Sequence, residues 1–296
     1  MVKLLYVALL AFTLLPGGVH AQQLAATVAP PIPTLLPLAD IQYLPEAIPA
    51  DGMAPGKAQE EEPTVRPFIT DDARVVGERL AQIETWFRID KESGQQWVMA
   101  AYGPNDKLEL TLGAVAGYER SHNSKALFSY ALPLLQAKYL FKPYGHGKGP
   151  GLGLVMGSFL PMGKGGFKPP GFGTFSFATI SQCFGANEDL LLHLNVGLNY
   201  LHVNKEHELL RTWGFGTQVR TIGGMHLVGE IFSGDPYVPG AGTSWQAGFR
   251  HFFSDLLQID MTCGKGISGA NPLPFWASGG VRIVLERWQK KHHGRQ

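Results

Sequence analysis

The sequence predicts an all-β fold: a transmembrane antiparallel up-and-down β-barrel of about 12 strands, of the outer-membrane type. Three observations lead to this prediction. Segments of about 9–11 residues, the length that a tilted strand needs to cross a bilayer, alternate between apolar and polar residues along most of the chain. The connections between these segments differ in length in an ordered way. Glycine makes up 37 of the 296 residues and only 17% are charged, against about 7% and about 25% in soluble domains.

The amino terminus carries an export signal. A basic residue precedes an apolar stretch at residues 4–15. Val19 and Ala21 then supply aliphatic or small side chains at the positions that a signal peptidase reads, which predicts a signal peptide at 1–21. Because about a dozen apolar residues are too few to span a bilayer as a helix, we expect export and cleavage before Gln22.

Residues 22–65 are rich in proline and carry the acidic run Glu60-Glu61-Glu62. Each proline fixes φ and removes a backbone donor, so this composition disfavours both helix and sheet. We interpret the stretch as a flexible periplasmic segment. It is either a tether to a partner or to the cell wall, or a leader without a specific role.

The alternation that defines the strands is clearest at residues 189–200. Leucine, valine and tyrosine side chains share one face there, while His193, Asn195 and Asn199 share the other. Residues 108–118, 213–220 and 256–263 repeat the pattern. We expect strands near 78–90, 95–103, 107–119, 126–142, 151–161, 173–184, 189–203, 209–220, 224–233, 243–253, 256–264 and 276–288. The barrel then occupies residues 66–288, and a basic tail follows at 289–296.

The connections are sorted by length. After even-numbered strands they are mostly tight, as at 104–106, 185–188, 221–224 and 254–255. After most odd-numbered strands they are longer, as at 162–172, 204–208, 234–242 and 265–275. Outer-membrane barrels have short periplasmic turns and longer external loops. A soluble β-sandwich, the alternative explanation of the alternation, has no reason to sort its loops in this way.

Aromatic residues mark the expected membrane interfaces. One girdle consists of Tyr118, Tyr200, Trp213 and Trp245, at the loop-side ends of strands. The other consists of Tyr139, Phe141, Phe184, Phe253 and Trp288. Trp86 and Trp276 do not fit, because they fall on the polar face unless a bulge shifts the register. Glycines concentrate on the polar face, where they ease the curvature of a closing sheet.

Charged residues of both signs collect at the inward-facing positions. These candidate lumen-lining residues are Glu84, Arg88, Glu109, Glu119, Lys138, Arg220, Glu230, Arg250, Asp260, Arg282 and Glu286. One interpretation is a structural ladder of paired charges that fills a narrow interior. The other is a lining that selects permeant solutes. One residue can serve both purposes.

The beginning of the predicted barrel resembles a known family. Residues 66–73 read R-P-F-I-T-D-D-A, and residues 82–87 read Q-I-E-T-W-F. This is similar to the opening of the MetA-pathway-of-phenol-degradation family of outer-membrane transporters, which begins R-P-F-x-T-D-D-A and leads into a first strand like E-L-E-T-x-F. The resemblance implies an outer-membrane barrel associated with uptake of aromatic or other apolar solutes. It implies no binding residues.

Other chemistry has little support in the sequence. His122 and Ser124 resemble the pairing in outer-membrane phospholipases that use Ser-His-Asn, but they fall in an expected external loop, and such a motif needs its structural context. A lipid-modifying hydrolase is therefore only an alternative, and we expect no enzyme, no cofactor and no metal site. Cys183 and Cys263 fall on strands that are not neighbours, which predicts two free thiols. A net charge of +1 gives no electrostatic case for nucleic acid.

The sequence therefore predicts a channel or transporter for small solutes in the cell outer membrane, gated by the loops near 163–172 and 237–242. Apolar or aromatic compounds are the solutes that the family resemblance implies. Expected partners are the lipid bilayer with its lipopolysaccharide, the solute, and the outer-membrane assembly machinery, although Trp288 is followed by a basic tail instead of ending the chain. A second alternative is a closed structural barrel that anchors a partner through the Pro-rich segment.

Overall fold

The computed structural model describes residues 69–120, 126–144, 149–185, 189–203, 205–234, 242–254, 256–269 and 272–285. The predicted signal peptide, the Pro-rich segment, the basic tail and Trp288 lie outside the described residues. Within the described ranges, no helix is long and apolar enough to cross a membrane.

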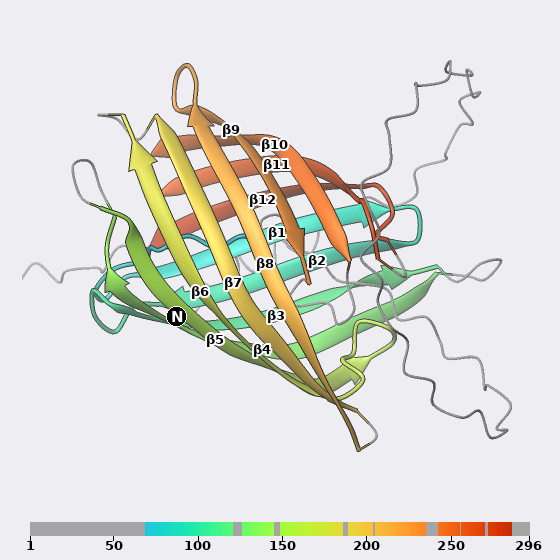
Figure 1. Ribbon diagram of the computed structural model, residues 1–296. Helices are drawn as coiled ribbons and strands as arrows, with labels where there is room; N and C mark the ends of the chain where they lie inside the picture. The colour runs from blue at the N-terminus through green and yellow to red at the C-terminus, as the bar shows by residue number, and fades with distance from the viewer. Residues whose placement is uncertain are drawn as a thin grey trace, which may run out of the picture. The chain divides into compact units, whose positions relative to one another are not determined.

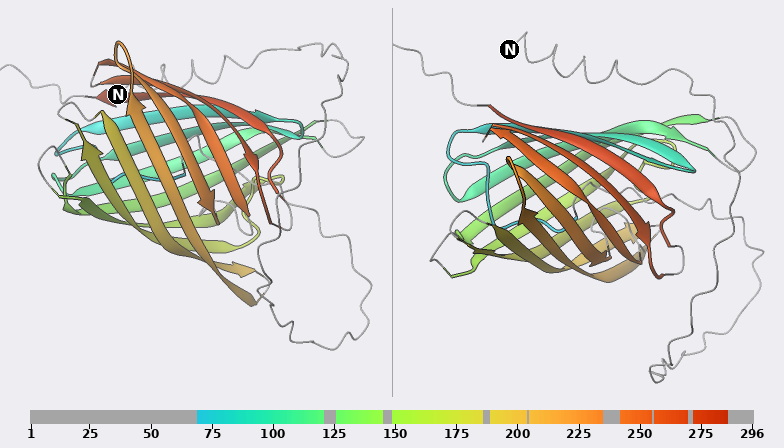
Figure 2. Two further views of the ribbon diagram at one scale, coloured as in Figure 1. Left: turned by 45° about the horizontal axis from the view of Figure 1, so that its top comes forward. Right: turned by 90° about the horizontal axis from the view of Figure 1, so that it is seen from above.

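The described residues form twelve strands that close into one antiparallel barrel (Figures 1 and 2). The strands are β1 (Ala81–Asp90), β2 (Ser93–Tyr102), β3 (Leu108–Glu119), β4 (Leu127–Lys142), β5 (Gly151–Lys164), β6 (Phe172–Phe184), β7 (Leu190–Val203), β8 (Glu206–Arg220), β9 (Met225–Ser233), β10 (Thr243–Ser254), β11 (Leu257–Gly266) and β12 (Trp276–Leu285). Each strand pairs with its neighbours in sequence, and β1 also pairs with β12, which closes the sheet. The predicted up-and-down barrel is confirmed.

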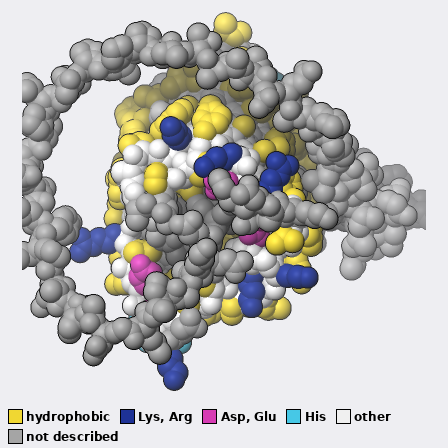
Figure 3. Space-filling view, turned by 90° about the vertical axis from the view of Figure 1, so that its right-hand side faces the viewer, with side chains coloured by type: hydrophobic (Ala, Val, Ile, Leu, Met, Phe, Trp, Pro, Cys, Tyr) yellow, Lys and Arg dark blue, Asp and Glu magenta, His cyan; other side chains and the backbone are white. Residues whose placement is uncertain are grey.

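The two faces of the wall differ as the alternation predicts. On β7, Leu194, Val196 and Leu198 point outward and are 40%, 57% and 47% exposed, whereas His193 and Asn195 point inward and are buried. Exposed large apolar side chains occur in the same way on other strands, for example Leu110 and Leu112 on β3. Seen from the loop end, apolar side chains lie around the rim of the barrel (Figure 3). A closed barrel satisfies its backbone hydrogen bonds internally, so an apolar exterior of this kind faces lipid. The protein is an outer-membrane barrel.

The two ends of the barrel carry different connections. We call the end where β1 begins and β12 ends the turn end, and the opposite end the loop end. Long connections cluster at the loop end, at 120–126, 165–171, 234–242 and 267–275. The sorting is less regular than predicted, because 91–92 and 204–205 at the loop end are short and 143–150 at the turn end is long. In outer-membrane barrels, the end with the short turns faces the periplasm.

Three predictions about single residues have clear outcomes. Trp86 and Trp276 point into the barrel, 3% and 0% exposed, and the β1–β12 register between them contains no bulge. They therefore belong to the interior and not to a girdle. Trp245 points outward near the loop end of β10, as expected, whereas Trp213 points outward at the middle of β8 and not at a strand end. Cys183 and Cys263 are free thiols, on β6 and β11.

Candidate functional site

The chain segment that precedes β1 lies inside the barrel. Side chains of inward-facing strand residues bind its backbone: Glu230 of β9 accepts the N–H groups of both Ile69 and Thr70, at 2.8 and 2.7 Å. Further along the segment, the Val76 N–H donates to Glu109 of β3 at 2.8 Å. Because β9 and β3 lie on different sides of the barrel, the segment crosses the lumen before it enters β1.

The middle of this segment is held by β6. The Ala73 N–H donates to Ser181 Oγ at 2.8 Å, and Thr179 Oγ1 donates to the Asp71 carbonyl oxygen at 2.8 Å. Ser181 also hydrogen-bonds His193 Nδ1 on the adjacent strand β7, at 2.8 Å. Ala73 is fully buried. We call residues 69–76 the lumen segment.

The acidic side chains of the lumen segment meet a buried cation. Lys138 of β4 donates to Asp71 Oδ1 at 2.8 Å and lies 3.6 Å from Asp72 Oδ1. Asp72 also pairs with Arg74 at 2.6 Å. Burial alone would raise the pKa of Asp72, but the charges of Arg74 and Lys138, with His193 close by, outweigh it and hold that pKa well below its ordinary value.

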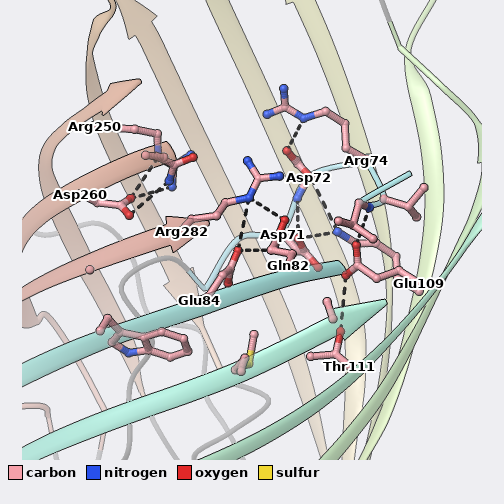
Figure 4. A pocket seen from close by; sticks show the side chains of 18 of the residues that line it. Asp71, Asp72, Arg74, Gln82, Glu84, Glu109, Thr111, Arg250, Asp260 and Arg282 are labelled. Carbon is pink, nitrogen blue, oxygen red and sulfur yellow. Dashed lines mark hydrogen bonds and ion pairs between the residues drawn. The ribbon is translucent and has the colours of Figure 1, made fainter. Parts of the chain in front are cut away.

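Beside the lumen segment lies a cavity of about 230 Å³. Its wall carries a second set of paired charges (Figure 4). Arg250 Nε and Nη2 donate to Asp260 Oδ1 at 3.0 and 2.9 Å, which joins β10 to β11. Arg282 Nε donates to Gln82 Oε1 at 2.6 Å and lies 3.8 Å from Glu84 Oε1. The charges of this cavity are therefore arranged in pairs of opposite sign.

The interior changes character towards the loop end, where buried aromatic rings predominate and surround a buried ion pair. Trp86 and Trp97 stack on each other, with centroids 5.6 Å apart and planes 8° apart. Arg88 lies over the ring of Trp276, 5.0 Å from its centroid, and pairs with Asp90 at 3.2 Å. The buried apolar cluster contains Ile69, Trp86, Trp97, Met99, Val115, Leu134, Val155, Phe167, Phe175, Phe177, Phe232, Leu273 and Trp276.

Two loop residues complete this apolar cluster from the loop end. Phe167, in the β5–β6 connection, is 4% exposed, and its N–H donates to Ser129 Oγ at 2.9 Å. The neighbouring Gly166 N–H donates to Glu119 Oε1 at 2.6 Å. Leu273, in the β11–β12 connection, is 2% exposed. The predicted gating loop near 163–172 thus folds into the barrel, whereas 237–241 lies outside the described residues.

The structure places the predicted lumen residues in four settings. The residues around the cavity are Glu84, Glu109, Lys138, Arg250, Asp260 and Arg282. Glu230 is buried against the lumen segment, and Arg88 is buried against Trp276. Glu119 accepts a hydrogen bond from the β5–β6 connection. Arg220 is exposed at the turn end. Glu286, His122 and Ser124 lie outside the described residues. A role of these residues in transport stays a prediction.

The position of the lumen segment inside the barrel was not predicted from the sequence. Asp71, Asp72 and Arg74 belong to the segment that was interpreted as the start of the barrel wall. One signal was available, because these residues are polar and do not alternate like the strands that follow. No group of three or more potential metal-binding side chains occurs within the described ranges. The site offers paired charges and aromatic surfaces for binding a solute.

A closed barrel with a lipid-facing exterior and a polar cavity defines the class of outer-membrane β-barrel proteins. The chain belongs to the family described as "Uncharacterised conserved protein UCP029691", which matches residues 58–284. A search of curated proteins found no match. The finer resemblance to the phenol-degradation family stays a prediction.

Solved outer-membrane structures are similar to this chain at low sequence identity. The COG4313 outer membrane channel from Pseudomonas putida F1 is 12% identical with a TM-score of 0.57, and the match covers 75% of this chain and 100% of that chain. The KdgM porin in complex with disordered oligogalacturonate is 8% identical with a TM-score of 0.48, covering 69% and 99%. The NanC porin is 7% identical with a TM-score of 0.46, covering 70% and 100%.

Proposed function

We propose that the protein is a passive channel for small solutes across the outer membrane. The observation that carries this proposal is the cavity of about 230 Å³ inside a barrel that lipid surrounds. A barrel that serves only as an anchor gains nothing from charged side chains around an interior space, because buried ion pairs are costly to desolvate. Around a path for solutes, the same side chains supply polar contacts to the permeant molecule.

The path through this channel is closed at two levels in the structure. The lumen segment crosses the interior from Ile69, which packs in the aromatic cluster, to Val76, which is bound to Glu109. Phe167 and Leu273 pack against the same cluster from the loop end. Conduction therefore requires that both move aside. The aromatic cluster supports solutes with an apolar or aromatic part, in line with the family resemblance, since such a part would replace the packing of Phe167.

The orientation of the barrel supports a further part of this proposal. Exposed cationic side chains gather at the loop end (Figure 3). They are Lys91, Arg120, Lys164, Lys168, Lys205, Arg211 and Lys265. If the turn end faces the periplasm, these cations stand at the height of the lipopolysaccharide phosphates, to which arginine and lysine side chains bind well.

The test is solute flux into liposomes that contain the purified full-length protein. We expect small uncharged solutes to enter faster than into protein-free liposomes, and the rate to rise when Phe167→Ala widens the loop-end half. The exposed and outward-facing Phe172, changed to alanine, is the matched control and should leave the rate unchanged. Flux at the protein-free rate for both the native protein and Phe167→Ala would contradict the channel and favour a structural barrel.

A further inference from the structure

The contacts of the lumen segment show what kind of molecule the lumen is built to hold. Most of them address the peptide backbone and not particular side chains. Both oxygens of Glu230 accept consecutive N–H groups, those of Ile69 and Thr70. Ser181 and Glu109 accept the N–H groups of Ala73 and Val76. Such contacts do not depend on sequence, and any extended peptide presents the same donors.

The side-chain contacts add a preference to this backbone recognition. Ile69 is 7% exposed and packs in the aromatic cluster, and Ala73 is fully buried where a larger side chain has no room. Asp71 and Asp72 meet Lys138. The preferred ligand thus has an apolar residue, one further residue in the place of Thr70, then two acidic residues and a small one.

A buried amide beside Ile69 points to the same class of ligand. Asn195 of β7 is 6% exposed, and neither its amide nitrogen nor its oxygen has a hydrogen-bond partner among the described residues. It lines a space of about 10 Å³ next to Ile69. A side-chain amide offers one acceptor and a donor side by side, which matches the N–H and C=O of a peptide group. Buried polar groups without partners are rare, so this one marks an interaction that a longer ligand would complete.

The barrel wall also leaves room for a peptide backbone at this point. Gly214 of β8 faces inward opposite the lumen segment, and a Cβ placed on it would come within 2.5 Å of Thr70 Oγ1. A glycine at this position lets the chain pass close to the wall.

We propose that the lumen is a binding site for short extended peptides, which the lumen segment occupies as a tethered ligand. Within the channel function proposed above, on which this inference rests, acidic peptides with a leading apolar residue are then a class of solute. A free peptide enters when the lumen segment leaves, and it takes over the same contacts to Glu230, Ser181, Lys138 and Glu109. The tether keeps the segment at high local concentration, so a free peptide competes poorly with the native protein.

The experiment uses a labelled, N-acetylated synthetic peptide with the sequence of residues 69–77, I-T-D-D-A-R-V-V-G, and the full-length protein in detergent. The Ala73→Arg variant releases the tethered segment, because an arginine does not fit where a fully buried methyl group sits. A second variant, Asp71→Asn with Asp72→Asn, releases it without adding volume. Glu78→Gln, at an exposed residue that pairs only with the exposed Arg79 among the described residues, is the matched control.

Fluorescence anisotropy should show saturable binding of the peptide to both releasing variants. Binding to the native protein and to Glu78→Gln should be at least about tenfold weaker, because the tethered segment competes. A peptide N-methylated at the positions of Ile69 and Thr70 loses both donors to Glu230 and should bind about tenfold more weakly or worse. N-methylation at the position of Val75, whose N–H has no partner among the described residues, should leave affinity unchanged.

Absence of peptide binding to both folded releasing variants would overturn the proposal. So would equal affinity for the doubly N-methylated peptide and its parent. The binding measurement needs no flux, so its outcome is separate from that of the channel. Solute flux without peptide binding would contradict the peptide site and leave the channel proposal standing. Peptide binding without solute flux would contradict the channel and leave the peptide site standing.

Discussion

The two halves of the lumen are built on the same strands and the same alternation, yet they are closed by opposite means. In the turn-end half, hydrogen bonds and ion pairs hold the lumen segment against Lys138 and Glu109. The first residue of the segment, Ile69, is bound to Glu230 and reaches the aromatic rings. In the loop-end half, Phe167 and Leu273 are buried against aromatic rings. A polar closure depends on the charges of the groups that form it, and therefore on pH. It also depends on each of the residues that supply an ion pair or a hydrogen bond. An apolar closure depends on volume.

The largest effect should follow when both closures are weakened together. Lys138→Met leaves Asp71 and Asp72 without their buried cation, which costs about 3–5 kcal/mol and shifts the docked population of the segment by about a hundredfold or more. Phe167→Ala removes ring packing worth about 3–5 kcal/mol at the other closure. Because the closures lie in series, the double variant should raise single-channel conductance by more than the sum of the two single variants.

Planar-bilayer recording of the single and double variants tests this series arrangement. The matched control pairs Lys107→Met with Phe172→Ala, two exposed residues at the same two ends of the barrel. If the conductance increase of the double variant equals the sum of the two single increases, the two closures do not lie in series on one path.

A smaller effect should distinguish the halves by pH. Docking lowers the pKa of Asp72, whereas in a released segment this carboxyl titrates near its ordinary value of 3.8. Below that pH the released segment binds a proton that the docked segment does not, so acid favours release. The Asp72 contribution should therefore raise conductance as the pH falls through about 4.

The Asp72→Asn variant isolates this contribution, and single-channel conductance from pH 7 to pH 3 measures it. The variant should conduct more than the native protein at neutral pH and show a shallower rise in acid. If conductance rises equally steeply with falling pH in the native protein and in the variant, Asp72 does not contribute to the polar closure. Phe167→Ala changes no titratable group and should keep the native steepness.

The same contrast explains how much could be predicted from the sequence. Alternation along β7 and the other strands specifies which face meets lipid, because a strand repeats every two residues. It gave the number of strands and most of their bounds. The interior was harder, since Trp86 and Trp276 at inward positions look like misplaced girdle residues until the aromatic cluster is known. The lumen segment could not be predicted, because contacts such as Ile69 to Glu230 join residues 161 positions apart without any periodic signal.

The smallest effect we predict concerns the boundary between the halves, where Gly280 of β12 lies opposite Trp86 of β1. A Cβ on Gly280 would come within 2.9 Å of Trp86 Cβ and 3.3 Å of the Thr85 carbonyl oxygen. Gly280→Ala therefore forces Trp86 to shift, at a cost of about 1–3 kcal/mol in unfolding free energy. Urea unfolding and tryptophan fluorescence measure the change.

Gly173→Ala is the matched control for this boundary. Gly173 also faces inward, on β6, but a Cβ there meets its nearest atom at 3.6 Å, an ordinary contact. We expect unfolding free energy and tryptophan emission close to the native values for this variant, because a single added methyl group fits. An equal loss of stability in the two variants would mean that the close contact between Gly280 and Trp86 does not determine the cost of the added methyl group.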